Sequence, residues 1–214
     1  MILEQERNMI VAYGKKLVTH GLTKGTGGNI SIYNQEEGLM AISPSGMDYF
    51  TTSARDIVVL DLEGNKIDGN GNPSSEYGMH RICYQKRENI CAVVHTHSTY
   101  CAILAALNWS IEPVHYLIGY AGRNVRCAPY RIFGSEELAQ VALEYIQDRY
   151  AVLLANHGLL AIGDSIEYAF NTAEEIEFVA QIYYKAKCVG NPVLLSSDEI
   201  DDFLKKFKTY GKKK

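Results

Sequence analysis

Apolar residues recur at helical spacing near the start of the chain, where Met9, Ile10, Tyr13, Leu17 and Val18 would share one face of a helix. Gly21 follows this run and is a typical residue just beyond a helix end. Similar periodicity, together with Ser residues suited to N-caps at Ser74 or Ser75, Ser135 and Ser197, predicts further helices. The predicted helices cover residues 3–20, 74–87, 99–107, 135–149, 165–189 and 197–210.

Short runs of β-branched and other apolar residues lie between these helices and predict strands. They cover residues 30–33, 39–43, 57–61, 90–97, 151–155 and 159–162, with another short extended piece after the turn at 63–65. Strands and helices do not alternate strictly, which argues against a Rossmann fold. No repeat or linker divides the chain. We therefore expect one three-layer α/β domain over residues 1–214, with a mainly antiparallel or mixed central sheet flanked by helices.

Composition narrows the class of protein without naming a function. The 214 residues are 47% apolar and 21% charged, as in ordinary globular proteins, and the net charge of -4 gives no basic surface for nucleic acid. No apolar run is long enough to span a membrane, and the first residues lack the basic-then-apolar order of a secretory signal. The odd number of cysteines, five, and the absence of a Cys-x-x-Cys pair argue against a disulfide framework and against a zinc ribbon. The expected location is the cytoplasm.

Candidate chemistry follows two of the predicted strands. His95 and His97 end one apolar run and, two residues apart on a strand, would point to the same face; His157 follows the run at 151–155. With the carboxylate of Glu76 they would form the open ligand set of a catalytic zinc or similar divalent ion, with Mn, Co and Fe as alternatives. The competing interpretation is a set of hydrogen-bonded structural histidines. His20, His80 and His115 lack this arrangement and are expected to be structural or on the surface.

A second candidate site would bind phosphate. Three segments offer backbone amides, an Asn side-chain amide and hydroxyls: Gly25-Thr26-Gly27-Gly28-Asn29, Pro44-Ser45-Gly46 and Ser74-Ser75. These segments match neither the P-loop nor the dinucleotide fingerprint, and glycine-rich segments are often only turns. Because the serine pair adjoins Glu76, a phosphate bound there would lie close to the metal.

These residues resemble the class II aldolase and adducin-type family, which includes L-fuculose-phosphate aldolases and L-ribulose-5-phosphate 4-epimerases. The resemblance is carried, in the family's order, by residues 25–31, 44–46, 73–76, 94–97, 127–130, 133–134, 156–158 and 207–211. It implies zinc on His95, His97 and His157 with Glu76 as a fourth ligand. It also implies substrate phosphate on Asn29, Ser45, Gly46, Ser74 and Ser75, and a substrate pocket that includes Gly28, Phe133 and Tyr210.

The resemblance further implies that Tyr116 acts as an acid in the site of a neighbouring subunit, within a C4 homotetramer whose sites lie at subunit interfaces. We expect cleavage of a ketose 1-phosphate, with L-fuculose 1-phosphate as the leading substrate, to dihydroxyacetone phosphate and L-lactaldehyde. The metal would stabilise the enediolate charge as a Lewis acid, and Glu76 would move the proton at carbon.

Four alternatives remain open. One is a 4-epimerase, although epimerases of the family have Asp where this chain has Glu76. Others are a methylthioribulose-phosphate dehydratase and an aldolase for another deoxypentulose phosphate. The last is a metal-binding module without catalysis, which would not need Ser74, Ser75 and Asn29 for phosphate.

Overall fold

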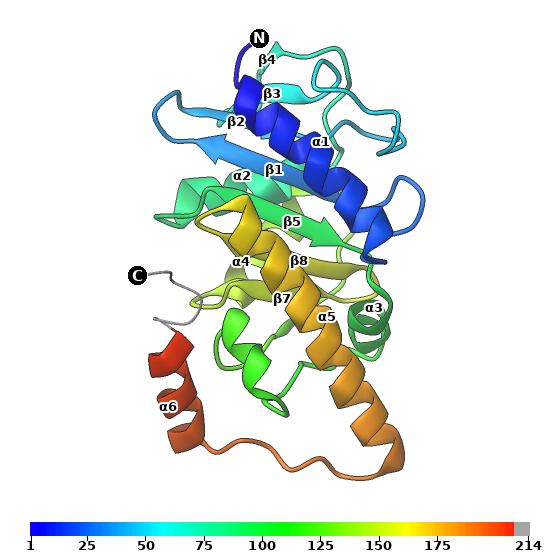
Figure 1. Cartoon of the computed structure of the whole chain (residues 1–214), viewed down its shortest axis with the longest axis vertical. Coiled ribbons are helices and arrows are strands. Elements are labelled where there is room, and N and C mark those ends of the chain that lie inside the picture. The colour runs from blue at the N-terminus through cyan, green and yellow to red at the C-terminus, as the bar shows by residue number, and fades with distance from the viewer. Residues whose placement is uncertain (208–214) are drawn as a thin grey trace.

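An eight-stranded sheet runs through the centre of residues 1–207, which the computed structural model describes (Figure 1). In spatial order its strands are β4 (Lys66–Asp68), β3 (Val58–Asp61), β2 (Leu39–Ile42), β1 (Asn29–Asn34), β5 (Ala92–Thr96), β8 (Gly158–Gly163), β7 (Ala151–Leu154) and β6 (Cys127–Ala128). Neighbours pair antiparallel except β6 with β7, so the predicted mixed and mainly antiparallel sheet is confirmed.

Helices cover both faces of the sheet, as the three-layer prediction required (Figure 1). One face packs against α1 (Glu4–Thr19), α3 (Thr99–Ala106) and α5 (Ile166–Val189). The other face packs against α2 (Tyr77–Lys86) and α4 (Glu136–Ile146). A short 3-10 helix, η1 (Tyr116–Tyr120), lies beside α5. Helix α6 (Ser197–Phe207) lies beside η1. Within the described residues no helix is both long and apolar enough to cross a membrane.

Strand β5 occupies the middle of the sheet and sends alternate side chains to the two cores. Ala92 and Val94 lie in the core under α1 and α5, whereas Val93 lies in the core under α2 and α4. The side chain of His95, two residues after Val93, therefore points to the same face of the sheet, toward α2 and α4. The strand's position decides that the histidine points toward the start of α2, where Glu76 lies.

Several element ends differ from the predictions for local reasons. Helix α2 begins after Glu76 and not at a serine cap, because Ser74 forms a turn in which its carbonyl accepts from the amide of Tyr77 at 3.1 Å. Helix α4 ends at Ile146 because Gln147 has a φ of 42°. Ser196, not Ser197, accepts from the amide of Glu199 at the start of α6. Neither β6 nor η1 was predicted, because both are too short to show a period.

Candidate metal centre

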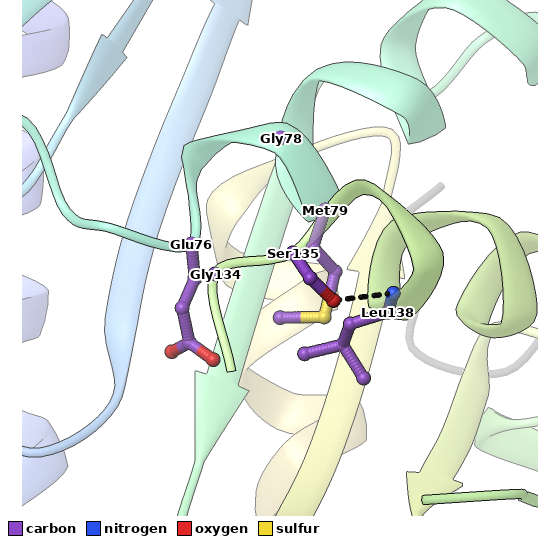
Figure 2. Close-up of a pocket in the computed structure, with 6 residues that line it drawn as sticks. All are labelled: Glu76, Gly78, Met79, Gly134, Ser135 and Leu138. Carbon is purple, nitrogen blue, oxygen red and sulfur yellow. Dashed lines mark hydrogen bonds between the residues drawn. The ribbon is translucent and has the colours of Figure 1, made fainter. Parts of the chain in front are cut away.

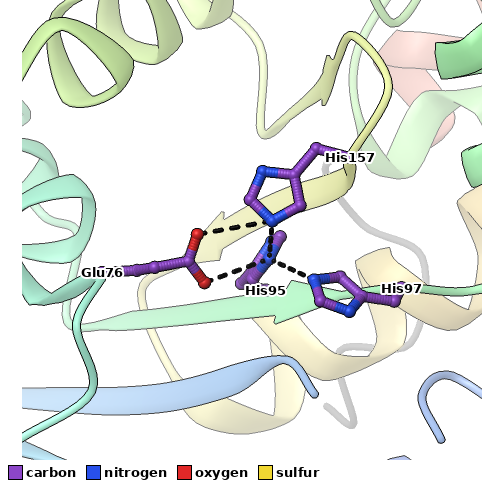
Figure 3. Close-up of side chains that lie close together, drawn as sticks. All are labelled: Glu76, His95, His97 and His157. Carbon is purple, nitrogen blue, oxygen red and sulfur yellow. Dashed lines mark hydrogen bonds and ion pairs between the residues drawn. The ribbon is translucent and has the colours of Figure 1, made fainter. Parts of the chain in front are cut away.

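Four side chains that are distant in sequence meet at the end of β5 (Figure 3). Glu76 comes from the start of α2, His95 and His97 from the end of β5, and His157 from the turn between β7 and β8. The Nε2 atom of His95 lies 3.0 Å from Nε2 of His97 and 3.2 Å from Nε2 of His157. The carboxylate oxygens of Glu76 lie 3.4 Å from Nε2 of His95 and 3.3 Å from Nε2 of His157. The structure thus brings together all four predicted ligands.

The protonation of the histidines suits a cation. Burial lowers the pKa of His95 well below its ordinary value, and repulsion from His157 and His97 adds to this. Burial followed by repulsion from His157 lowers the pKa of His97 to about 4, and burial lowers the pKa of His157 against the opposing charge of Glu76. At neutral pH the imidazoles are therefore uncharged. Because Nδ1 of His95 donates to the carbonyl of Leu159 at 2.9 Å, its Nε2 atom carries the lone pair.

The two carboxylate oxygens of Glu76 differ in their hydrogen bonds, and the difference leaves one of them available to a cation. Its Oε2 atom accepts from the Asn29 amide nitrogen at 2.9 Å, whereas its Oε1 atom is buried and accepts no hydrogen bond. Such an orphaned oxygen is costly unless another partner binds it. Three neutral imidazole nitrogens and one carboxylate are the donor set of a catalytic zinc site. The residues present therefore fit a divalent metal ion.

Glycines let other segments closely approach the end of β5, where the two candidate ligands His95 and His97 lie. A Cβ atom on Gly158 would lie 2.1 Å from the carbonyl oxygen of Thr96. A Cβ atom on Gly28, which has a φ of 68°, would lie 2.6 Å from the carbonyl oxygen of His95. Tyr49 fixes the glycine segment, because its hydroxyl donates to the carbonyl of Gly28 at 2.8 Å. The glycine segment predicted from the sequence therefore packs directly on the metal centre.

The segments predicted to bind phosphate also lie next to one another. Pro44 and Pro73 form an isolated antiparallel bridge, and the amide of Ser45 donates to the carbonyl of Asn72 at 2.9 Å. The register sets Ser45 opposite Asn72 and Ser74 opposite Ser43, so the two segments lie side by side while Ser45 and Ser74 stand on opposite sides of the bridge. Ser45, Gly46 and Ser75 are exposed, whereas Ser74 is buried and accepts from the amide of Glu76 at 3.3 Å. The side chain of Asn29 is already engaged by Glu76, so it has less freedom to bind phosphate than expected.

An open cavity of about 320 Å³ lies over three of the four ligands. Its lining consists of Ser75, Glu76, His97, Tyr130, Arg131, Phe133, Asn156 and His157. The lining combines the metal ligands, one residue of the phosphate segments and an aromatic rim. A second recess, between the starts of α2 and α4, has no room for a water molecule (Figure 2). There Ser135 caps α4 by accepting from the amide of Leu138 at 3.1 Å.

The remaining predicted site residues have four different outcomes. Phe133 lines the cavity, as expected of a pocket residue. Tyr116 lies on η1, is 48% exposed and does not line the cavity of its own chain as far as residues 1–207 show. Tyr210 lies outside the described residues. The pocket role of Gly28 remains a prediction.

Sequence reasoning missed three residues on the cavity wall and one below it. Tyr130, Arg131 and Asn156 line the cavity, but they lie in connecting segments without a periodic signal. His80 is fully buried beneath the site, and Nε2 of its ring contacts Oδ1 of Asn29. One signal for His80 was available, because it follows Glu76 by four residues and so shares its face of α2.

Comparisons with known proteins agree with this geometry. Residues 8–184 match the family described as Class II Aldolase and Adducin N-terminal domain. The chain is 57% identical over 211 residues to a 5-deoxy-D-ribulose 1-phosphate aldolase of Bacillus thuringiensis serovar kurstaki, covering 99% of each chain. It is 41% identical over 193 residues to an L-fuculose phosphate aldolase of Escherichia coli, covering 89% of this chain and 88% of that protein. A solved L-fuculose 1-phosphate aldolase superposes with a TM-score of 0.94 at 47% identity, covering 95% of this chain and 96% of that one.

Proposed function

The chain belongs to the class II aldolase and adducin family, and from this premise we propose that it is a divalent-metal-dependent aldolase acting on a ketose 1-phosphate. The reaction would break the C3–C4 bond of the sugar and release dihydroxyacetone phosphate and a short aldehyde. The observation that carries the proposal is the meeting of Glu76 with three uncharged histidines at the floor of an open cavity. A structural histidine cluster would need neither the cavity nor an unpartnered carboxylate oxygen.

The favoured substrate is 5-deoxyribulose 1-phosphate, which would give dihydroxyacetone phosphate and acetaldehyde. Its support is the 57% identity to an aldolase named for that substrate, over 99% of both chains. This choice revises the expectation of L-fuculose 1-phosphate, which stays as a second candidate because of the 41% identical relative and the solved structure. Both sugars end in a methyl group, which suits the aromatic side chains of Tyr130 and Phe133 on the cavity rim.

We propose zinc as the metal, held by His95, His97, His157 and Glu76, because imidazole and carboxylate ligands in this number are typical of catalytic zinc. A bound divalent ion would supply Lewis-acid stabilisation of negative charge on the substrate's oxygen atoms. Three imidazoles also accept other divalent ions, so metal analysis of the purified protein is needed.

The chain's own side chains would move the protons. Cleavage removes a proton from the C4 hydroxyl and requires one at C3, so the overall proton balance is zero. Glu76 would deliver the proton to C3, because its Oε1 atom is free of hydrogen bonds and borders the cavity. The exposed hydroxyls of Ser45 and Ser75 and the amide of Gly46 would hold the phosphate.

Tyr116 would exchange the proton at the C4 oxygen from a neighbouring copy of the chain. Its support is that the residue is half-exposed and stands outside the cavity of its own chain. This assignment requires an oligomer with sites at subunit interfaces, and the expected homotetramer remains a proposal with it.

The test measures release of dihydroxyacetone phosphate from 5-deoxyribulose 1-phosphate and from L-fuculose 1-phosphate by the metal-loaded protein. We expect release that a chelator abolishes and zinc restores, with a kcat/KM at least about tenfold higher for the five-carbon sugar, a difference of about 1.4 kcal/mol. A reversed preference would restore the fuculose assignment. No release from either sugar, with metal bound, would reject the aldolase proposal.

A further inference from the structure

A buried chain of polar side chains runs from the metal centre into the interface between α2 and β1. Its members are Glu76, Asn29, His80, Ser31 and Tyr84. Glu76, at the N-cap of α2, is followed at intervals of four residues by His80 and Tyr84 on the helix. Asn29 and Ser31 are two residues apart on β1, so the two series face each other and alternate. The rings of Tyr33 and Tyr84 stack at the far end with centroids 5.1 Å apart.

The contacts along this chain are short and shielded from water. The Asn29 amide nitrogen lies 2.9 Å from Oε2 of Glu76, and Oδ1 of Asn29 lies 2.5 Å from Nε2 of His80. Nδ1 of His80 lies 2.7 Å from the Ser31 hydroxyl, which lies 2.6 Å from the Tyr84 hydroxyl. His80 and Ser31 are fully buried, and Asn29 and Tyr84 are at most 7% exposed. Hydrogen bonds in such surroundings fix orientation strongly.

The chemistry of each group allows only one direction of donation. A carboxylate only accepts, so the Asn29 nitrogen must face Glu76 and its oxygen must face His80. His80 must then carry its proton on Nε2 and leave Nδ1 as an acceptor for the Ser31 hydroxyl. Ser31 in turn accepts from Tyr84. Burial supports this order, since it lowers the pKa of His80 to about 3 and raises that of Tyr84 well above its ordinary value.

We infer that His80 is a positioning residue, which orients the Asn29 amide so that it holds one oxygen of Glu76 and leaves the other facing the histidines. The inference rests on the proposed function of Glu76 as ligand and proton carrier. Without the Nε2–H of His80, the Asn29 amide would lose the partner that distinguishes its two ends. Rotation of that amide would turn its oxygen toward the carboxylate, where the two would repel.

The experiment compares His80→Leu, which removes both polar atoms, with His80→Gln, which restores an N–H group. Each variant is loaded with Co²⁺ alone, and its ligand-field absorption spectrum and Co²⁺ affinity are compared with those of the wild-type protein. We expect an altered spectrum and about 10- to 100-fold weaker affinity in His80→Leu, with recovery toward wild type in His80→Gln. His20→Gln, at a surface ion pair with Glu174, is the matched control and should change neither quantity.

A second measurement follows exchange of the carbon-bound proton of dihydroxyacetone phosphate into deuterated water. His80→Leu should lower the exchange rate by about 10- to 100-fold with little change in KM, and His80→Gln should recover most of it. A wild-type spectrum and exchange rate in His80→Leu would overturn the inference. So would equal losses in both variants that track a common fall in Tm, since that result means packing alone. If wild-type protein exchanges no proton, the proposed function fails, while the Co²⁺ spectrum still tests the position of Glu76.

Discussion

At the scale of single residues, the candidate metal centre is built from groups that burial keeps uncharged. His95 lies at zero exposure on β5, and Leu159 fixes its tautomer through the Nδ1 hydrogen bond. Glu76 is held at Oε2 by Asn29, whereas its Oε1 atom accepts no hydrogen bond and lies 3.3 Å from Nε2 of His157. These two candidate ligands are therefore oriented by protein groups before a metal arrives, which reduces the ordering cost of binding.

Removing one imidazole should weaken metal binding sharply. We expect His97→Ala to lower zinc affinity by at least about 100-fold. Loss of a residue that only hydrogen-bonds to a metal ligand lowers affinity about 10- to 100-fold, and loss of a direct ligand should lower it at least as much. Titration against a chromophoric chelator measures this affinity. His20→Ala, on the surface beside Glu174, should leave it unchanged. Wild-type affinity in His97→Ala would remove that residue from the ligand set.

The buried His80 should make the metal-free protein sensitive to acid. Burial lowers its pKa from 6.5 to about 3, so below pH 6.5 the unfolded chain takes up a proton that the folded chain does not. Its contribution to stability is thus complete above pH 6.5 and is lost as pH falls toward 3. At pH 5 the loss from this residue is about 2 kcal/mol, from 1.36 kcal/mol for each unit below 6.5.

Urea unfolding of metal-free wild type and His80→Gln at pH 7.5 and pH 5 measures this contribution. The wild-type protein should lose about 2 kcal/mol more than the variant between these pH values. The remaining histidines contribute equally to both proteins. Identical losses would show that His80 is not the residue responsible.

At the scale of elements, the site depends on how closely β8 approaches β5. The two strands pair from Ala92 opposite Gly163 to Thr96 opposite Leu159, and Gly158 lies just beyond the last pair. Because Gly158 follows His157, any displacement of β8 also moves a candidate metal ligand. Strand pairing and ligand geometry are therefore coupled at this position.

Gly158→Ala should lower both stability and metal affinity. Its Cβ atom would lie 2.1 Å from the Thr96 carbonyl oxygen, so the backbone must shift, at a cost of about 1–3 kcal/mol in unfolding free energy. Gly190→Ala is the control, because its Cβ atom would meet no atom within 4 Å. Denaturant unfolding and zinc titration of both variants check this prediction. A Gly158→Ala protein as stable as Gly190→Ala would contradict the close approach.

At the scale of the whole molecule, the proposed chemistry needs more than one copy of the chain. The cavity contains the ligands and part of the phosphate segments, but Tyr116 lies elsewhere on the surface, on η1. If this residue acts in a neighbouring copy, two defects on different chains can be combined into an intact site.

Mixing two inactive variants tests that arrangement. Glu76→Gln and Tyr116→Phe should each lose most aldolase activity, whereas a mixture refolded or exchanged together should recover roughly a quarter of wild-type activity, from random pairing. Light scattering of each variant provides the oligomeric state as a control. A mixture no more active than its components would place Tyr116 outside the neighbouring site.

The metal centre could be predicted in large part because it depends on simple periodicity. His95 and His97 share a face of a strand, and His157 ends another, so only the pairing of β5 with β8 was needed to join them. Glu76 was included as the nearby acid, but no local rule connects α2 to β5, so only the family resemblance made its place in the ligand set specific. The role of His80 depends on the register between α2 and β1, which one sequence does not specify.

The rim of the cavity could not be predicted for a different reason. Tyr130 and Arg131 lie in the connection between β6 and α4, where side chains follow no period and β6 itself has two residues. The fold class, by contrast, followed from the many short strands that do not alternate strictly with helices. The apolar pattern along the chain was therefore sufficient to predict the layers of the fold, and it was insufficient to predict which loop residues line the cavity.

The metal ligands and the rim are anchored in very different ways, and this has a consequence for how substrate choice can change. His95 lies on a central strand paired on both sides, whereas Phe133 is 66% exposed on a connecting segment. If the proposed function holds, substitutions along residues 130–133 would reshape the space for the aldehyde at little cost in folding free energy, because these side chains are exposed. Laboratory evolution toward new aldehydes should accumulate substitutions in residues 130–133 first, and in the residues at the end of β5 last.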